Sequence, residues 1–506
     1  MPCWLHTTQP VESLWAPGLM NIMEPVSPRK KIAIIGGGIS GLFVAYLLKG
    51  RGWQVDVYEK AIRVGGNCHT VSMKVPRVSG GDNGILRWAD MGVNDFNEPM
   101  YAEVYELMQA LGVETPPLED TASFFTADGN IVYTLDGGYE TPMPIGFAKQ
   151  LARFKGLATD VLHSSSYKGW TLRQFLKYPD FEFTNEFIQY CIFARANAMY
   201  FADDRDVGNM PVQSVMHYYV LQEGYGTNVP VKRRYIRGGS SAWAKKLCDA
   251  SGAQVYTDRK VVSVNPLKGD APEVVWREGS AQGSDTYTHV VFACHANQAA
   301  DVLEPVLGDK EHGAAFVDMR RMLRSIKYTQ TRAYAHLDAS VLPRKEAWRT
   351  YNVRIRARGE TPKPYSMTYV INRHQADAGN PHDDFLDCEQ FFVSLAPDRK
   401  LDPSKILKDE HGKPLTRTFQ HNVVDFHCIQ AQQDLWGDED NRIQGQAHLY
   451  FTGGWTVGAG LHIECWESAK QVVRLLSETA RSSAQMTYED SPSGRYEPEY
   501  IRRLVR

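Results

Sequence analysis

Residues 31–42 read KIAIIGGGISGL, and this stretch decides the fold. The apolar run Ile32–Ile35 predicts a buried parallel strand. Gly36, Gly38 and Gly41 then follow with the spacing G-x-G-x-x-G. These glycines allow a tight turn, close approach of backbone to a pyrophosphate, and close packing of helix on strand. Because a helix start presents free N–H groups, the turn predicts a phosphate site that includes Ile39 and Ser40.

The sequence after the turn supports a dinucleotide rather than an isolated phosphate. A helix is expected over 42–49, ended by Gly50 and Gly52, and a second strand over 54–59. Glu59 ends that strand, where an acid accepts hydrogen bonds from the ribose of an adenine dinucleotide. The alternative is an ordinary βαβ unit with no ligand, and the combination of turn, helix, strand and acid favours the dinucleotide.

Bulk composition narrows the class of protein. The 506 residues predict two or three domains, and a net charge of −3 does not favour nucleic acid as a partner. The basic runs 232–234 and 502–503 are interpreted as solvated faces. No zinc-spaced cluster occurs among the eight cysteines, so no metal site is predicted and a reducing, cytoplasmic compartment fits best. No apolar run approaches the ~20 residues that cross a bilayer.

A second glycine turn follows the ribose acid. It comprises Lys60, Arg63, Gly65, Gly66 and Asn67, and Cys68 and His69 come next. Arg63 is expected to meet phosphates. Here the sequence resembles the flavin-containing amine oxidase superfamily, which implies FAD as the cofactor. The family usually has a basic residue after the glycine pair; the sequence of this turn is similar to that of a bacterial polyenoic fatty acid isomerase of the same superfamily. A structural turn histidine is the alternative to a flavin contact for His69.

The resemblance extends from about residue 30 to 477 and implies further cofactor contacts. The strand 86–90 resembles the one that leads under the flavin, and Val261 matches a position whose backbone touches adenine. The stretch 448–455, Gly458 and a helix over 463–476 resemble the C-terminal FAD motif. There Gly453, Gly454, Gly460, Leu461 and His462 would hold the ribityl chain and aim the helix at the pyrimidine edge.

The predicted fold class is α/β, a Rossmann-type FAD-binding domain of the glutathione-reductase kind with an interleaved α+β substrate domain. The cofactor domain is expected over 29–95, 231–305 and 445–480, and the substrate domain over 96–230 and 306–444. An irregular extension, 1–28, and a polar tail, 481–506, would flank them. Residues 147–222 are helical and aromatic-rich, which fits either a lid over an apolar pocket or an ordinary helical core.

Catalytic groups are harder to place than the cofactor. His462, Lys327 and Arg332 are the candidates near the flavin, and packing or helix capping is the alternative for His462. Tyr369 and Trp455 are candidate walls of the substrate pocket. The expected function is an FAD-dependent oxidoreductase that abstracts a hydride from a largely apolar amine, amino-acid-derived or lipid-like molecule. A flavin-dependent double-bond isomerase of an unsaturated, fatty acid-like substrate and a non-catalytic FAD-binding protein remain as alternatives.

Overall fold

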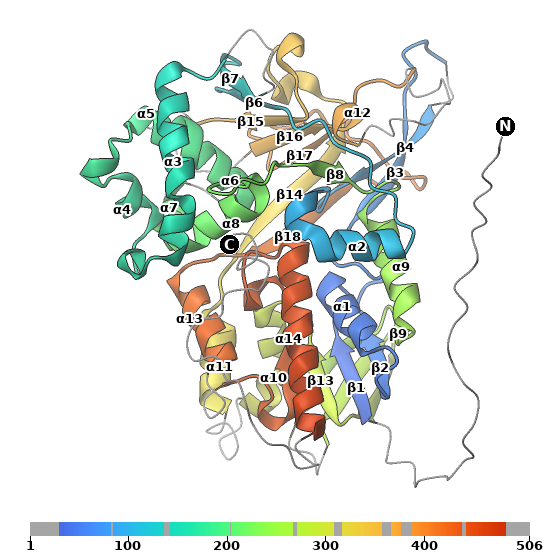
Figure 1. Ribbon diagram of the computed structural model, residues 1–506. Coiled ribbons are helices and arrows are strands. Elements are labelled where there is room, and N and C mark those ends of the chain that lie inside the picture. The colour runs from blue at the N-terminus through green and yellow to red at the C-terminus, as the bar shows by residue number, and fades with distance from the viewer. Residues whose placement is uncertain are drawn as a thin grey trace, which may run out of the picture.

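A computed structural model describes residues 30–81, 84–135, 142–202, 204–266, 271–307, 316–356, 366–375, 387–437 and 442–481. The expected extension over 1–28 and the expected tail beyond residue 481 lie outside the described residues. Figure 1 shows two bodies, a lower one around β1 and α14 and an upper one around a larger sheet. No helix in the described ranges is long and apolar enough to cross a membrane.

The lower body is built on a parallel sheet that contains the opening stretch. Its strand order is β19-β13-β1-β2-β9. The strands are β1 (Lys30–Ile35), β2 (Trp53–Tyr58), β9 (Gln254–Tyr256), β13 (His289–Phe292) and β19 (Leu449–Phe451). Ile32, Ala33 and Ile34 are fully buried because helices or a second sheet cover both faces of β1. This sheet confirms the predicted α/β fold class of Rossmann type.

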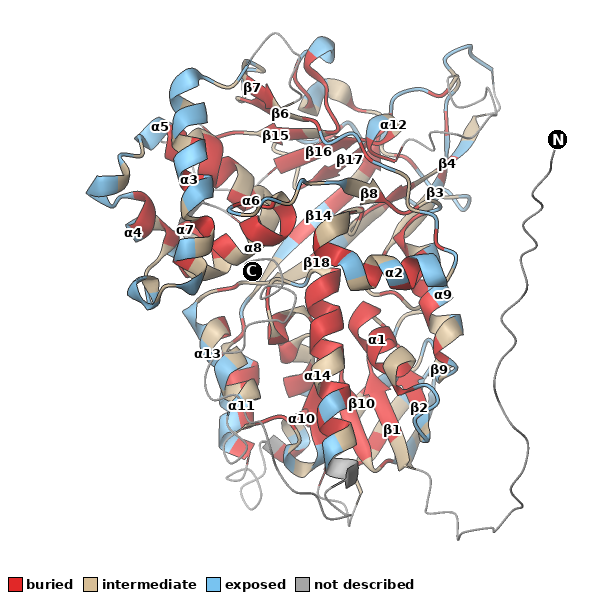
Figure 2. Cartoon of the chain, in the orientation of Figure 1, coloured by how far each residue is buried: buried red, intermediate tan, exposed pale blue. Residues whose placement is uncertain are grey.

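Different elements cover the two faces of the parallel sheet. On one face pack α1 (Ile39–Leu48), α9 (Ser240–Ser251) and α14 (His462–Arg481). On the other lie α10 (Ala296–Leu307), α11 (Val317–Ser325), α13 (Phe426–Trp436) and the antiparallel sheet of β10 (Lys260–Asn265), β11 (Glu273–Glu278) and β12 (Ala281–Thr286). Figure 2 shows the buried core continuing through β1, α1 and α14.

The strand order reverses between β1 and β13, and this reversal places the site. The chain leaves β1 in one direction toward β2 and later returns to add β13 on the other side. At such a switch point the loops after the two strands separate and leave a crevice at their carboxyl ends. The Gly36 turn follows β1, and Ala293 and Cys294 follow β13, so both loops border this crevice.

The upper body contains a seven-stranded mixed sheet, in the order β18-β14-β17-β16-β15-β6-β7. Its strands are β6 (Ala122–Phe125), β7 (Ile131–Leu135), β14 (Tyr328–His336), β15 (Tyr351–Arg354), β16 (Ser366–Val370), β17 (Phe392–Leu395) and β18 (Thr416–Asn422). The hairpin predicted around Asp128-Gly129 is present as β6 and β7. Strands from residues 122 to 422 therefore share one sheet, although segments of the lower body, such as β9 to β13, lie between them in sequence.

Helices and two small ribbons complete the upper body. The helices beside the sheet are α3 (Ile145–His163), α4 (Leu172–Leu176), α5 (Asn185–Phe187), α6 (Ala194–Tyr200), α7 (Asp204–Asn209) and α8 (Val212–Glu223). The ribbons are β3 (Thr70–Val75) with β4 (Ile85–Asp90), and β5 (Asp95–Asn97) with β8 (Arg233–Tyr235), and α2 (Ala102–Ala110) follows β5. Phe154, Phe175 and Phe187 fill the helical core.

A substitution at Gly41 shows how far close backbone packing at the turn stabilises the fold. A Cβ at Gly41 would lie 2.2 Å from the Gly36 carbonyl oxygen, so Gly41→Ala should lower the thermal unfolding midpoint, with a loss of about 2 kcal/mol or more. Gly156→Ala is the control, because Gly156 in α3 has open space around it and alanine favours helix. An unchanged midpoint for Gly41→Ala would contradict this account.

Candidate functional site

One large cavity of about 1190 Å³ extends from the switch point into the upper body. Single small-molecule sites typically occupy about 300–1,000 Å³, so this cavity has room for a cofactor and a substrate together. Most predicted site residues line it. They are Gly36, Gly38, Ile39, Ser40, Glu59, Lys60, Arg63, Gly65, Gly66, Asn67, Val261, Tyr369, Gly453, Gly454, Trp455, Gly460, Leu461 and His462.

The first glycine turn exposes backbone donors to the cavity. Gly36 has a φ of +114°, and a Cβ there would lie 2.5 Å from the Ala293 carbonyl oxygen. Helix α1 begins at Ile39 with no side-chain cap and no acidic residue in its first turn. Its first N–H groups and positive dipole end therefore remain available to an anion at the cavity wall.

Glu59 lies directly after β2, beside the first glycine turn. One of its carboxylate oxygens accepts from the Gly37 N–H at 2.9 Å, and the other accepts from the Ala61 N–H at 2.8 Å. These bonds fix a buried carboxylate that still lines the cavity. Because a carboxylate has about four lone-pair sites, two remain for hydroxyl groups of a ligand.

The second glycine turn lies against the first. The Gly65 N–H donates to the Gly37 carbonyl oxygen at 2.8 Å, and a Cβ on Gly66 would lie 3.1 Å from the Gly38 Cα. Gly65 and Gly66 both have positive φ. Two backbone segments thus meet with no side chain between them, and together they form a cradle of main-chain atoms at the cavity.

Arg63 has partners other than the predicted phosphate. Its guanidinium donates to the carbonyl oxygens of Cys68, at 2.8 Å, and Val64, at 3.1 Å, and contacts the His69 ring. Arg63 therefore fastens the second turn to the chain that follows it. Burial, with the neighbouring Arg63 and Arg417, lowers the pKa of His69 to about 3, so this imidazole is neutral at the cavity wall.

A buried carboxylate anchors the next segment of this wall. Asp90 accepts from the Ser240 N–H and hydroxyl at the start of α9, from the Thr70 hydroxyl, and from the Gln375 amide. Burial raises the pKa of Asp90, and these hydrogen bonds oppose that rise. The β3–β4 ribbon, α9 and the segment after β16 are thereby held together behind the second turn.

The C-terminal loop closes the cavity from the other side. Gly454 packs on Gly460 so closely that a Cβ at Gly454 would lie 2.2 Å from the Gly460 Cα. The Glu464 carboxylate accepts from the N–H groups of Ala459, Gly460 and Leu461 at 2.8–3.0 Å. The N–H donors just before α14 are therefore taken by a side chain of the helix itself.

His462 lies between this loop and the second turn. Its Nε2 is 3.5 Å from the Cys68 Sγ, and burial lowers the pKa of His462 to about 4. Burial also raises the pKa of the Cys68 thiol. Both groups are consequently uncharged at neutral pH, and they join two loops that lie 394 positions apart in sequence.

Three predicted site residues do not line the cavity. Lys327 is mostly exposed and pairs with Asp425 at 3.3 Å, and Arg332 is exposed on β14 beside Tyr334. Gly41 lies behind the turn, against Gly36. Lys327 and Arg332 are exposed and do not line the cavity, so the geometry gives neither a part in chemistry there.

The aromatic side chains of the helical segment 147–222 fit both structures predicted for it, a lid over an apolar pocket and an ordinary helical core. Tyr200, Phe201, Tyr218 and Tyr219 line the cavity, whereas others such as Phe175 fill the helical core. The segment is thus both a packed helical core and a cavity wall. Its cavity-facing aromatics exclude water and offer apolar contact.

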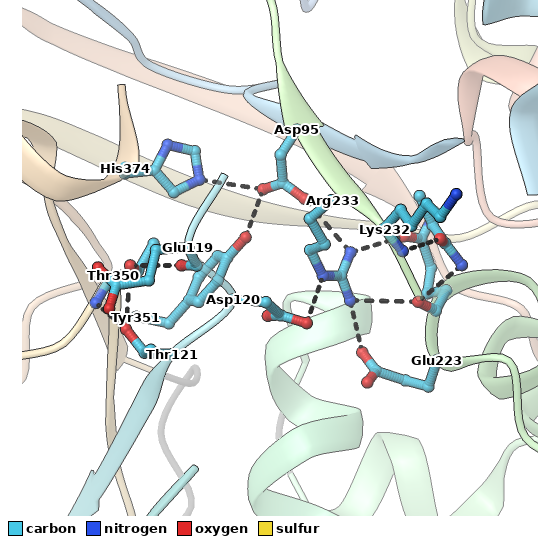
Figure 3. A network of polar contacts seen from close by, with 12 residues as sticks. Asp95, Glu119, Asp120, Thr121, Glu223, Lys232, Arg233, Thr350, Tyr351 and His374 are labelled. Atoms are coloured by element: carbon cyan, nitrogen blue, oxygen red, sulfur yellow. Dashed lines mark hydrogen bonds and ion pairs between the residues drawn. The ribbon is translucent and has the colours of Figure 1, made fainter. Parts of the chain in front are cut away.

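A network of buried charges that sequence analysis missed lines the upper part of the cavity (Figure 3). Arg233 pairs with Asp95 at 3.3 Å, Asp120 at 3.3 Å and Glu223 at 2.7 Å. The other Asp95 oxygen accepts from the Tyr351 hydroxyl at 2.9 Å and bonds to the His374 Nε2 at 3.0 Å. The network fixes β5, β8, β15 and the end of α8 around the cavity.

Arg233 also corrects the interpretation of the basic run 232–234 as a solvated face. Only 9% of its side chain is exposed, and Arg234 pairs with Glu98. The three acidic partners of Arg233 come from residues 95, 120 and 223, so the run of basic residues carries no local signal of burial.

The network around Arg233 holds more acidic than basic side chains. Burial is the main cause that raises the pKa of the more exposed Asp120, and Asp95 and Glu223 add to that rise against the lowering effect of Arg233.

Glu464 gives the site a measurable pH dependence. Burial raises its pKa from 4.5 to about 7, and the three backbone bonds oppose this. A raised carboxyl pKa contributes stability that is present below pH 4.5 and is lost as pH rises through 7. Relative to Glu464→Gln, the wild type should therefore lose about 3 kcal/mol of unfolding free energy between pH 4.5 and pH 8. Denaturant unfolding across this range, with the exposed Glu186→Gln as control, measures the difference; a pH-independent difference for Glu464→Gln would contradict the assignment.

Known proteins with related sequences and folds fit this geometry. The family model of flavin containing amine oxidoreductases matches residues 39–333. Amine oxidase [flavin-containing] B of Sus scrofa is 23% identical over 336 residues, which cover 58% of this chain and 54% of that enzyme. Among solved structures, a variant of putrescine oxidase with redesigned cofactor binding shares 14% identity with a TM-score of 0.58, covering 89% of this chain and 99% of that one.

A second solved structure has a different activity in its description. The CLA-producing fatty acid isomerase from P. acnes shares 17% identity with a TM-score of 0.55, and covers 89% of this chain and 99% of that one. At these identities the solved structures show the fold alone. The family model spans more than half of the chain. Its family contains a flavin, and the cavity at the switch point has room for one. This chain belongs to the flavin containing amine oxidoreductase family.

Proposed function

We propose that this protein is an FAD-dependent oxidoreductase that acts on a largely apolar small molecule. The observation that carries the proposal is the main-chain cradle of Gly36, Gly38 and Gly66 at the switch point, beside the fixed carboxylate of Glu59. A Cβ on Gly38 would find only the Gly66 Cα within 4 Å, at 3.9 Å, so the space in front of it is open to a ligand.

The residues along the cavity fit an adenine dinucleotide followed by a flavin. Glu59 would accept the ribose hydroxyls, and Val261 of β10 would meet the adenine. The start of α1 would bind the pyrophosphate through its uncapped N–H groups. The loop from Gly453 to Leu461 would hold the ribityl chain, which leaves the aromatic part of the cavity for the flavin ring and a substrate.

A bound flavin would supply the redox chemistry by accepting two electrons from the substrate. The protein's own residues exclude water and orient the substrate. Tyr200, Tyr218 and Tyr369 contribute apolar ring faces to the cavity, and Trp455 is fixed there by a bond from its indole N–H to the Cys294 carbonyl oxygen at 3.1 Å. Neutral His462 and Cys68 add no charge to the part of the wall beside the Gly453–Leu461 loop.

Double-bond isomerisation without net oxidation is the second candidate function. It is favoured by the second glycine turn, whose sequence is similar to that of a polyenoic fatty acid isomerase, and by the shared fold with a fatty acid isomerase. An oxidase consumes oxygen and releases peroxide with each turnover, whereas an isomerase does neither. Oxygen uptake in the presence of a substrate that bleaches the flavin under anaerobic conditions separates the two candidates.

The cofactor proposal predicts that Gly38→Val abolishes FAD binding while the protein stays folded. The Cβ of this side chain would lie in ordinary contact with the Gly66 Cα, at 3.9 Å, so the isopropyl group would enter the open space in front of the cradle. Flavin absorbance after reconstitution measures binding, and circular dichroism checks the fold. Gly146→Val, on exposed α3 and away from the cavity, is the control. Full flavin content in Gly38→Val would contradict the proposed pyrophosphate site.

A further inference from the structure

A single arginine at the upper end of the cavity differs from the other buried charges of the site. Arg195 belongs to α6, lines the cavity and packs its guanidinium 5.7 Å from the Phe124 ring centre. Its Nη1 donates to the Tyr225 hydroxyl at 2.7 Å, but its Nε is buried without any hydrogen-bond partner. Arg195 therefore keeps a full positive charge, and its side-chain hydrogen-bond partners, Tyr225 and Tyr133, are phenols rather than carboxylates.

No carboxylate of the described residues forms an ion pair with Arg195. Glu223 acts on it through space, but that carboxylate is bound to Arg233 at 2.7 Å. Tyr225, Cys191 and Tyr133 also act on Arg195, and all three are uncharged at neutral pH because burial raises the pKa of each. Lys155 acts on it as a second cation, so it supplies no counter-charge. A buried charge without a counter-ion costs several kcal/mol, so the site is favourable for an anion that arrives from the cavity.

The surroundings of Arg195 define which anion fits. The cavity wall next to it is apolar, formed by Ala122, Phe124, Leu135, Ala198, Met199, Val353 and Met367. The planar guanidinium suits two parallel bonds to a carboxylate. In Figure 1, α6 and β6 belong to the upper body, whereas the glycine loop before α14 lies lower, at the junction with the parallel sheet.

We propose that Arg195 binds the carboxylate of the substrate, so that the protein acts on carboxylic acids with an apolar chain or ring. The acid group would be held at α6, and the apolar part would extend along the aromatic wall toward the Gly460–His462 loop. This inference rests on the proposed function for the identity of the cavity as the substrate site. It assigns Arg195 to substrate orientation and selection, at a distance from the reacting atoms.

The test uses three probes of equal chain length that differ in their head group: decanoate, 1-decanol and decylamine. Isothermal titration calorimetry on the FAD-reconstituted protein gives each dissociation constant. We expect wild-type protein to bind decanoate most tightly, and Arg195→Gln to weaken decanoate about 10- to 100-fold, as for a lost charge-assisted hydrogen bond. Binding of decanol should change less than about threefold, because its contacts are with the apolar wall.

Two further variants keep the test decisive. Arg153→Gln removes an exposed arginine that pairs with Glu182 on the surface, and it should leave decanoate binding unchanged. Arg195→Lys keeps the charge and loses the planar fork, and it should weaken decanoate less than Arg195→Gln does. If Arg195→Gln does not fold, a loss for decanoate without a loss for decanol in Arg195→Lys carries the same conclusion.

Three outcomes would overturn the proposal. The first is that the wild type binds decanoate no more tightly than decanol. The second is that it binds decylamine more tightly than decanoate, through Asp120 and Glu223. The third is that both Arg195 variants bind decanoate with an affinity within twofold of wild type. The calorimetric signal does not depend on flavin colour. A protein that takes up no FAD but binds decanoate through Arg195 would therefore contradict the proposed function and leave the carboxylate site standing.

Discussion

Contact of main chain with main chain at the switch point is the constraint on which the rest of the structure depends. Gly41 lies against the Gly36 carbonyl, Gly36 against Ala293, and Gly66 against Gly38. Because no side chain separates these segments, α1 begins directly at the cavity and its first N–H groups face a ligand. The contact of Gly36 with Ala293 also holds the loop after β1 against the loop after β13, at the reversal of strand order that opens the crevice.

Charge burial governs the other end of the cavity. Asp95, Asp120 and Glu223 surround Arg233 there, and Asp90, behind the second glycine turn, is satisfied at the start of α9. These partners satisfy groups that would otherwise be costly to bury, and they tie together segments from across the chain. Arg195 departs from this pattern, since it lines the cavity and no carboxylate of the described residues forms an ion pair with it. An arginine at the cavity without a counter-ion favours an anionic ligand there.

The sequence predicted the parts of this structure that follow local rules. The buried strand at Ile32–Ile35, the turn after it, the acid at Glu59 and the hairpin at Asp128 all appear where spacing and turn chemistry place them. The substrate end could not be predicted in the same way. Arg233 is buried by acids from three distant segments, and Lys327 is placed outside the cavity by the path of β14 and by Asp425. Such positions depend on tertiary packing, which no short motif encodes.

The most direct test of the central claim is identification of the cofactor that the purified protein carries. The protein is denatured after its absorbance spectrum is recorded, and the released small molecule is identified by mass spectrometry. The two glycine turns and Glu59 predict FAD, released intact from a yellow protein in a ratio of about one per chain. A folded protein that releases no flavin and takes up no added FAD, or one that carries a mononucleotide instead, would contradict the assignment of the cradle to an adenine dinucleotide.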